Sequence, residues 1–243
     1  MHLIKLNATD STNSYLRRLS ANESIENFTT VIAEKQLNGK GQMGAVWSSQ
    51  SAKNLTCSVF IDMSEFKLEH TFYISIATSL AIFKTLQFYF ISRLSVKWPN
   101  DILSEEKKVC GILIENVIKQ NEIKGTIIGI GLNVNQSEFK NLPNAASLKM
   151  ISGKIYDLDE VLNVIINNLK DYFKLLKARK YKTLKDEYER HLFRKDKPST
   201  FRDAGGFIFP GFIKGVTESG NLNVLLEDEV KREFDLKEIT LLY

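Results

Sequence analysis

A chain of 243 residues with 43% hydrophobic and 26% charged residues is typical of a globular protein and excludes a disordered one. This length suits one large domain with a small one, or two modest domains. The formal net charge is only +4, with Lys and Arg interspersed among Asp and Glu. The sequence therefore predicts no nucleic-acid-binding face and at most a modest preference for anionic ligands.

The number and spacing of the cysteines and histidines, together with the hydropathy, disfavour metal sites, secreted proteins and membrane proteins. The two cysteines, Cys57 and Cys110, lack metal-ligand spacing, so we expect reduced, buried thiols. His2, His70 and His191 are scattered, which disfavours a histidine triad or a zinc site. The first apolar run is too short for a signal peptide, and no segment reaches the ~20 apolar residues of a membrane span. We expect a cytoplasmic protein without membrane contact.

The N-terminal part predicts a strand, a helix and a second strand. Residues 2–6 form the first apolar run, and Asp10-Ser11-Thr12-Asn13 then precedes apolar residues at helical spacing. Side chains of this kind cap the free N–H groups at the start of a helix. Residues 29–33 are a β-branched run that predicts a buried strand.

A glycine-rich stretch, Glu34 to Trp47, follows that strand. Its three glycines permit backbone conformations closed to other residues and expose main-chain N–H groups, and Lys40 adds a positive charge. A dinucleotide-binding loop needs a helix at the last glycine, but residues 45–54 have no helical period, and no Walker spacing is present. Residues 55–61 predict a strand, so we expect a mobile loop between two strands.

The middle of the chain predicts a long helix and then strands. Apolar residues recur at three- and four-residue steps over residues 72–90, and residues 94–98 predict a strand that ends in the turn Pro99-Asn100-Asp101. Lys97 lies late in this apolar strand, where its ammonium needs a partner or a cleft. A structural salt bridge and a chemical role are both compatible with that position.

Two glycine-containing strands and two helices come next. Residues 109–115 contain Gly111, and residues 125–135 contain two more glycines. Glycine in a strand marks close approach of a ligand or of another backbone, and tight sheet packing is the competing explanation. Residues 143–148 predict a loop, followed by helices over residues 158–176 and 181–191.

From about Arg194 the helical period stops. Short strands separated by glycine and acidic turns predict a small β-barrel, with strands at residues 199–201, 207–216, 221–226, 230–234 and 239–242. The expected fold class is therefore α+β. A mixed sheet flanked by helices occupies residues 1–193, and the barrel occupies residues 194–243.

Three ordered motifs together resemble the biotin protein ligases. The glycine loop, with Gln36 before it and Trp47 closing it, is similar to the family segment Gly-Arg-Gly-Arg-x-Gly-Arg-x-Trp. The other two motifs are Lys97-Trp98-Pro99-Asn100-Asp101 followed by Lys108 to Glu115, and Gly129-Ile130-Gly131-Leu132-Asn133-Val134-Asn135. Order and spacing agree across essentially the whole chain. The resemblance implies the class II synthetase-like catalytic domain of biotin and lipoate ligases and an SH3-like C-terminal domain.

The resemblance also implies a two-step reaction. Biotin and MgATP give biotinyl-5′-AMP and pyrophosphate, and biotin then passes to a lysine of a biotin carboxyl carrier domain, typically that of acetyl-CoA carboxylase. Lys97 would contact the biotin carboxylate and stabilise negative charge as the acyl phosphate forms. The glycine loop would close over the adenylate and exclude water.

The site residues implied by the resemblance fall into three groups. Those expected at biotin are Ser11, Thr12, Asn13, Gln36, Gly39, Lys97 and Gly111. Those expected at ATP or the adenylate are Lys40, Gly41, Gln42, Trp47, Lys108 and Asn133. Asn100 and Asp101 would orient Lys97, help to hold the magnesium ion carried by ATP, or simply form the turn. Hydroxyls and the Gln36 amide suit the ureido ring of biotin, because an amide both donates and accepts.

The glycine loop departs from the family pattern at three positions. Where the family segment has arginine, this chain has Lys40, Gln42 and Ala45. Lys40 keeps a charge but loses the bidentate fork, whereas Gln42 and Ala45 lose the charge. Weaker retention of the adenylate is the hypothesis that follows.

Two alternative functions and two structural expectations complete the prediction. A lipoate or octanoate ligase on a related fold would need a pocket for an aliphatic tail without a ureido ring, which the polar side chains of Ser11, Thr12 and Gln36 disfavour. A non-catalytic biotin-binding regulator would consume no ATP. Because only ten residues precede Ser11, we expect no N-terminal helix-turn-helix domain and no DNA-binding role. A homodimer joined through the sheet edge is implied by resemblance alone.

Overall fold

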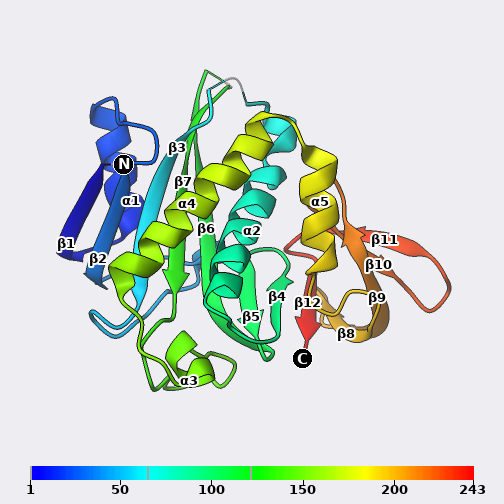
Figure 1. Cartoon of the computed structure of the whole chain (residues 1–243). Helices are drawn as coiled ribbons and strands as arrows, with labels where there is room; N and C mark the ends of the chain where they lie inside the picture. The colour runs from blue at the N-terminus through cyan, green and yellow to red at the C-terminus, as the bar shows by residue number, and fades with distance from the viewer. Residues whose placement is uncertain (1, 65, 121) are drawn as a thin grey trace.

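The structure is a computed structural model that describes residues 2–64, 66–120 and 122–243, and these residues form two β-sheets and five α-helices (Figure 1). The larger sheet has the strand order β1-β2-β3-β7-β6-β5-β4. Its strands are β1 (Leu3–Thr9), β2 (Thr30–Gln36), β3 (Leu55–Asp62), β4 (Leu94–Lys97), β5 (Asp101–Ser104), β6 (Lys107–Lys119) and β7 (Glu122–Leu132). β1 and β2 are parallel and the other pairs are antiparallel, so the predicted mixed sheet is confirmed.

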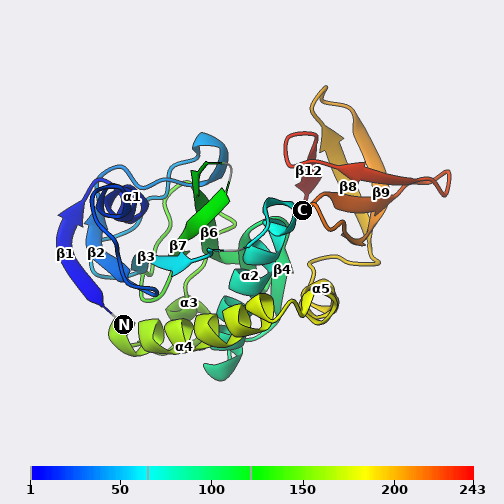
Figure 2. The same cartoon turned by 90° about the horizontal axis from the view of Figure 1, so that it is seen from above.

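Helices cover both faces of this sheet (Figure 2). One face carries α1 (Thr12–Asn22), and the other carries α2 (Phe72–Phe88) and α4 (Leu158–Lys177), which pack against each other. α5 (Tyr181–Arg190) packs beside α2. Successive residues of β3 alternate between the two layers: Val59 joins the core under α2, whereas Phe60 packs on Leu16 of α1. This period of two gives the sheet two buried faces.

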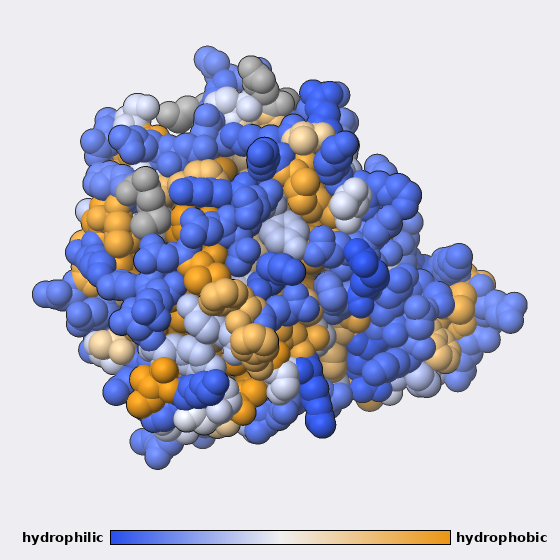
Figure 3. Space-filling view, viewed as in Figure 1, coloured by the Kyte–Doolittle hydropathy of each residue, from blue (hydrophilic) through white to orange (hydrophobic). Residues whose placement is uncertain are grey.

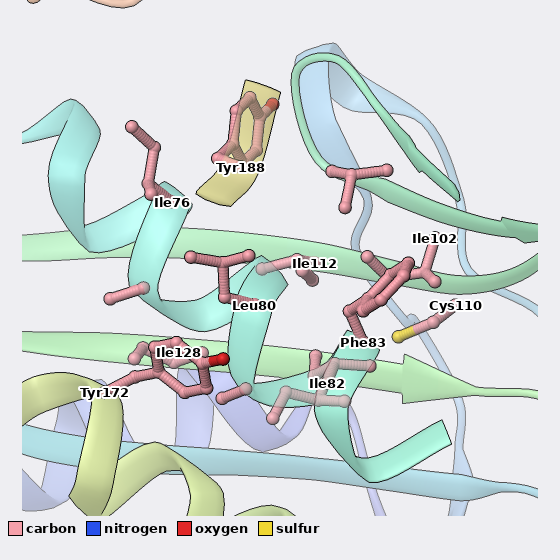
Figure 4. Packing of buried hydrophobic residues seen from close by; sticks show 14 of the residues in the cluster. Ile76, Leu80, Ile82, Phe83, Ile102, Cys110, Ile112, Ile128, Tyr172 and Tyr188 are labelled. Atoms are coloured by element: carbon pink, nitrogen blue, oxygen red, sulfur yellow. The ribbon is translucent and has the colours of Figure 1, made fainter. Parts of the chain in front are cut away.

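The main core lies between α2, the sheet and the outer helices. Figure 4 shows Leu80 and Phe83 of α2 beside Ile112 and Ile128 of the sheet, with Tyr172 of α4 on the same side. Most residues of α2 are buried because neighbouring elements cover much of the helix, whereas Lys84 and Gln87 are exposed. The outer surface seen from the α4 side is mostly hydrophilic, with scattered hydrophobic groups (Figure 3).

The C-terminal unit is a five-stranded antiparallel sheet in the order β11-β10-β9-β8-β12. Its strands are β8 (Pro198–Asp203), β9 (Ile208–Val216), β10 (Leu222–Leu225), β11 (Lys231–Phe234) and β12 (Ile239–Leu242). The SH3-like sheet is thus confirmed. Among the described residues no pairing joins β11 to β12, so the sheet stays open instead of closing into the expected barrel.

The C-terminal unit lies against the β4 edge of the large sheet (Figure 2). The Trp98 indole donates to the Gly220 carbonyl at 2.8 Å, and the Val96 and Phe193 segments exchange backbone contacts. A Cβ at Gly220 would lie 2.5 Å from the Phe72 ring, so the turn at Gly220 approaches α2 closely. None of the helices in the described residues has the length and apolar character needed to cross a membrane.

Two short elements were not predicted. β5 has four residues between the Trp98–Asn100 turn and a charged hairpin, and the turn signals on both sides concealed it. α3 (Leu148–Ser152) begins where the predicted loop ends. Ser147 caps it by accepting from Met150 N at 3.1 Å, and Gly153 ends it in the left-handed conformation. These two cap residues were the sequence signal from which α3 could have been predicted.

Candidate active site

A cavity of about 160 Å³ opens on the α1 side of the large sheet. Its floor is formed by the glycines of β6 and β7, one wall by the start of α1, and the other by the glycine loop. The lining residues include most of the predicted site: Ser11, Thr12, Asn13, Gln36, Lys40, Gly41, Gln42, Trp47, Asn100, Asp101, Lys108 and Gly111. Segments far apart in the sequence therefore converge on one cavity, as the motifs predicted.

A buried polar network forms one end of the cavity. Gln36 Oε1 accepts from the Thr12 backbone N–H at 2.8 Å and from the Thr12 hydroxyl at 3.0 Å. The Ser58 hydroxyl lies 2.6 Å from Asn13 Oδ1 and 2.7 Å from Thr12 Oγ1. The Asn13 amide donates to Glu115 Oε2 at 2.8 Å. These contacts hold amide and hydroxyl groups in fixed directions, which a site for a polar ring requires.

The two predicted roles of the Ser11-Thr12-Asn13 segment are divided between its residues. Ser11 is the N-cap of α1, and its hydroxyl accepts from Ser14 N at 3.5 Å. Thr12 and Asn13 are 3% and 2% exposed and line the cavity. Ser11 therefore caps the helix, while Thr12 lies at the cavity.

Three glycines allow large side chains to approach the sheet. A Cβ at Gly131 would lie 2.3 Å from the Trp47 indole, and one at Gly129 would lie 2.4 Å from Asn13 Oδ1. A Cβ at Gly111 would meet both Trp47 and Lys108 at 3.1 Å. Close approach of side chains, rather than tight packing between strands, explains these glycines.

The glycine loop is closed by its own backbone contacts. Trp47 N donates to Gly39 O at 2.9 Å, and Gly41 N donates to Ala45 O at 2.6 Å. A single 3₁₀ turn, Gln42–Gly44, follows Gly41, so no helix starts at the last glycine, as predicted. Two apolar side chains of the loop, Met43 and Val46, are 62% and 73% exposed, so the loop has apolar surface that closure over a ligand would bury.

Lys97 lies at the rim rather than in the lining described for the cavity. It pairs in register with Asp101, which pairs with Gly111, so the three residues share the α1 side of the sheet. The Lys97 ammonium lies 4.7 Å from the ring centroid of Tyr243. Burial lowers the pKa of Lys97, an effect that the carboxylate of Asp101 opposes and the charge of Lys108 reinforces. The alternative reading of Lys97, a structural salt bridge, is not supported, because none of the salt bridges in the described part of the chain includes this residue.

Asp101 and Lys108 form the charged part of the lining. Lys108 Nζ lies 2.6 Å from Asp101 Oδ1 and 5.8 Å from the centroid of the Trp47 ring. Asn100 is tied to β6, because its amide donates to Ile112 O at 2.7 Å and its carbonyl accepts from Ile112 N at 3.0 Å. In the described residues no group of three or more His, Cys, Asp and Glu could hold a metal ion.

Besides Lys97, two predicted residues lie outside the described lining of the cavity. Asn133 is 4% exposed, and its amide donates to Ala146 O at 3.1 Å, so it connects the end of β7 to the loop before α3. Gly39 lies behind the wall, where a Cβ would meet the Trp47 carbonyl at 2.3 Å. Both residues support the lining without forming it.

The sequence analysis missed Ser58 and Glu115, which complete the polar network. Ser58 is fully buried in β3, on the face that also carries Thr56, and no local pattern distinguished it from a core residue. The predicted buried thiols are confirmed. Cys57 lines the cavity and burial raises its pKa to about 12, while burial also raises the pKa of Cys110.

Comparisons with known proteins agree with this geometry. The Biotin/lipoate A/B protein ligase family matches residues 6–133. The bifunctional ligase/repressor BirA of Bacillus spizizenii is 33% identical over 171 residues, which cover 68% of this chain and 51% of that protein. The biotin–[acetyl-CoA-carboxylase] ligase of Mycobacterium tuberculosis is 27% identical over 66% of this chain and 60% of its own length. This chain spans about half the length of the first of these relatives.

The structural similarity covers nearly the whole chain. A biotin protein ligase from Aquifex aeolicus, solved in complex with biotin and ATP, superposes with a TM-score of 0.82 and 28% sequence identity. The match covers 99% of this chain and 98% of the Aquifex protein. The similarity therefore includes the C-terminal sheet, which lies outside the residues matched by the family.

Proposed function

Because this chain belongs to the biotin/lipoate A/B protein ligase family, we propose that it is a biotin protein ligase. In this proposal the enzyme activates biotin with MgATP as biotinyl-5′-AMP and releases pyrophosphate. It then transfers biotin to a lysine of a biotin carboxyl carrier domain of the acetyl-CoA carboxylase type. The relatives with that activity and the Aquifex complex with biotin and ATP support it.

The polar end of the cavity is the observation that carries the choice of biotin. Thr12, Asn13 and Gln36 present hydroxyl and amide groups, already held by Ser58 and Glu115, to a buried space. A ureido ring offers two N–H donors and a carbonyl acceptor to such groups, whereas the tail of lipoate or octanoate offers neither. A buried polar site of this kind rejects a ligand that leaves it unpaired.

We assign the remaining groups of the cavity to ATP and to the reacting atoms. The glycine loop from Lys40 to Trp47 would cover the adenylate and exclude water. Lys97 on β4 and Lys108 on β6, with β5 between these strands, would stabilise the negative charge that develops as the biotin carboxylate attacks the α-phosphorus. The carrier lysine would then attack the carbonyl carbon, with AMP as the leaving group.

Asp101 and Asn100 suit the magnesium ion that accompanies ATP. Mg²⁺ prefers oxygen ligands and is commonly bound through one or two carboxylates together with substrate phosphates. One carboxylate and one amide oxygen at the cavity fit that mode of binding, with the phosphates supplying the other ligands. The Asp101 carboxylate is paired with Lys108.

The proposal extends to organisation and setting. Residues 1–193 would form the catalytic domain and residues 194–243 the C-terminal domain. We propose a cytoplasmic enzyme with no DNA-binding role, on the basis of its free thiols and its interspersed charges. β1 is an edge strand that pairs with β2 on one side only in the described sheet. Its free side is the candidate surface for a homodimer.

Exchange of radiolabelled pyrophosphate into ATP tests the first step without a carrier. We expect exchange that depends on biotin and that lipoate or octanoate does not support. Exchange with lipoate alone would move the chain to the lipoate ligases. Binding of biotin without exchange would identify a non-catalytic biotin-binding protein.

A further inference from the structure

Tyr243, from the C-terminal unit, lies between Lys97 and Phe193. The Lys97 ammonium lies 4.7 Å from the centroid of the Tyr243 ring, and the Phe193 ring meets Tyr243 edge-on with centroids 5.2 Å apart. Phe193 is 8% exposed, and its backbone N–H donates to Val96 O at 2.8 Å. The tyrosine is thus wedged against the strand that carries Lys97.

The contact between the Lys97 ammonium and the Tyr243 ring matters because of the charged groups around Lys97. Its neighbour in register, Asp101, already pairs with Lys108 at 2.6 Å. None of the salt bridges in the described residues includes Lys97, so the Asp101 carboxylate and the face of the Tyr243 ring, 4.7 Å away, are the groups that favour its charged form. An aromatic face attracts an ammonium through its quadrupole, and more strongly where water is excluded. Burial lowers the pKa of Lys97, so a partner that favours the charged form matters here.

We propose that Tyr243 is a positioning residue for the adenylation step, whose ring holds the Lys97 ammonium at the rim of the cavity. This inference rests on the proposed ligase function. It gives the C-terminal sheet a part in the chemistry, because β12 pairs with β8 up to Leu242 and so fixes where Tyr243 begins. The neighbouring contact of Trp98 with Gly220 joins the same two units.

Two variants of Tyr243 separate the aromatic face from packing and from the hydroxyl. Tyr243→Leu keeps an apolar side chain but removes the ring, and we expect the turnover of biotin-dependent pyrophosphate release to fall about three- to thirty-fold. The KM values for biotin and ATP should change less than the turnover, because the ring acts through Lys97, whose charge is needed most in the transition state. Tyr243→Phe keeps the ring and should retain most of the rate. Phe207→Leu, at an exposed aromatic of the same unit, is the matched control.

A double-mutant cycle shows whether Tyr243 acts through Lys97. In a Lys97→Met background, the Tyr243→Leu change should have little further effect on residual turnover. Equal losses in both backgrounds, or equal losses in the Leu and Phe variants, would overturn the inference. A faster Tyr243→Leu enzyme would also overturn it, because the ring would then hold Lys97 away from the reaction. Biotin-dependent pyrophosphate release by the unmodified chain is measured first. If this activity were absent, the ligase proposal itself would be contradicted.

Discussion

At the scale of single residues, the glycines of β6 and β7 decide what can lie on the sheet. The Trp47 indole occupies the space where a Cβ of Gly131 would be, at 2.3 Å. We expect Gly131→Ala to displace Trp47 and to lower kcat/KM for ATP in pyrophosphate exchange at least about tenfold, since small displacements of positioning groups are costly.

The matched control for Gly131 is Gly205→Ala in the C-terminal unit. A Cβ there meets only the flexible Asp203 side chain, at 3.3 Å. Gly205→Ala should leave the rate of pyrophosphate exchange unchanged. If Gly131→Ala behaved like this control, Trp47 would not have the proposed role at the adenylate.

Gln42 carries the second prediction at this scale. It lines the cavity and also an adjoining cavity of about 280 Å³ toward the C-terminal unit. Gln42→Arg restores the charge and the bidentate donors found in the family. We expect slower release of free biotinyl-AMP when no carrier is present, measured by filtration and chromatography. Gln87→Arg adds the same charge on exposed α2, and equal release from both variants would refute weaker retention.

Most residues of the cavity could be predicted because they belong to contiguous motifs. The Gln36 and Thr12 pair and the Asp101 and Lys108 pair lie in or beside such motifs. Ser58, Glu115 and Tyr243 could not be predicted, because each acts through a contact with a residue far away in the sequence. No local period or turn records such a contact.

At the scale of elements, periodicity and turn signals predicted most helices and strands, and two short elements, β5 and α3, were missed. α2 shows what remained unpredicted: its spacing indicated a helix on a sheet, but α4 and α5 also pack against it. β5 follows the turn after β4 directly, and α3 lies inside a segment predicted to begin as a loop, so neither was separated from its neighbouring turn. Only the assembled fold specifies such segments.

The junction of α2 with the end of α5 carries a prediction on pH. His191 stacks on Phe83 with ring centroids 4.1 Å apart. Burial lowers the pKa of His191 below its ordinary 6.5, with Glu187 opposing the shift and Arg190 and Lys84 adding to it. Below about pH 6.5 the unfolded chain binds this proton more readily than the folded chain, so folding stability falls as the pH drops through that window.

We expect His191→Asn to weaken this dependence. Urea midpoints measured at about pH 7.5 and about pH 5.5 should differ less for the variant than for the unmodified chain. His2→Asn, at an exposed histidine, is the control. An unchanged difference in His191→Asn would show that other groups cause the loss of stability in acid.

At the scale of the whole molecule, the C-terminal sheet is attached to the segment that carries Lys97. The Trp98 indole donates to Gly220 O at 2.8 Å across the junction. Trp98→Phe removes this hydrogen bond and should lower the free energy of unfolding by about 1 kcal/mol. Protease cleavage near residue 220 should also become faster. Equal stability together with unchanged cleavage would mean that the junction is held elsewhere.

The two-unit organisation was predictable because the composition changes near Arg194, where helical spacing gives way to short strands and turns. The placement of the small sheet on the β4 edge was not. It depends on Gly220 approaching Phe72 and on the backbone exchange between Val96 and Phe193. Neither contact leaves a trace in composition or hydropathy.

Intact-mass spectrometry of an apo biotin carrier domain tests the central claim most directly. The domain is incubated with this protein, MgATP and biotin, with lipoate in a parallel tube. We predict a gain of one biotinyl group on the carrier, no gain with lipoate, and loss of the shift with Lys97→Ala but not with Lys84→Ala on exposed α2. A carrier left unmodified by biotin would contradict the ligase function, and a shift that survives Lys97→Ala would contradict the role assigned to Lys97.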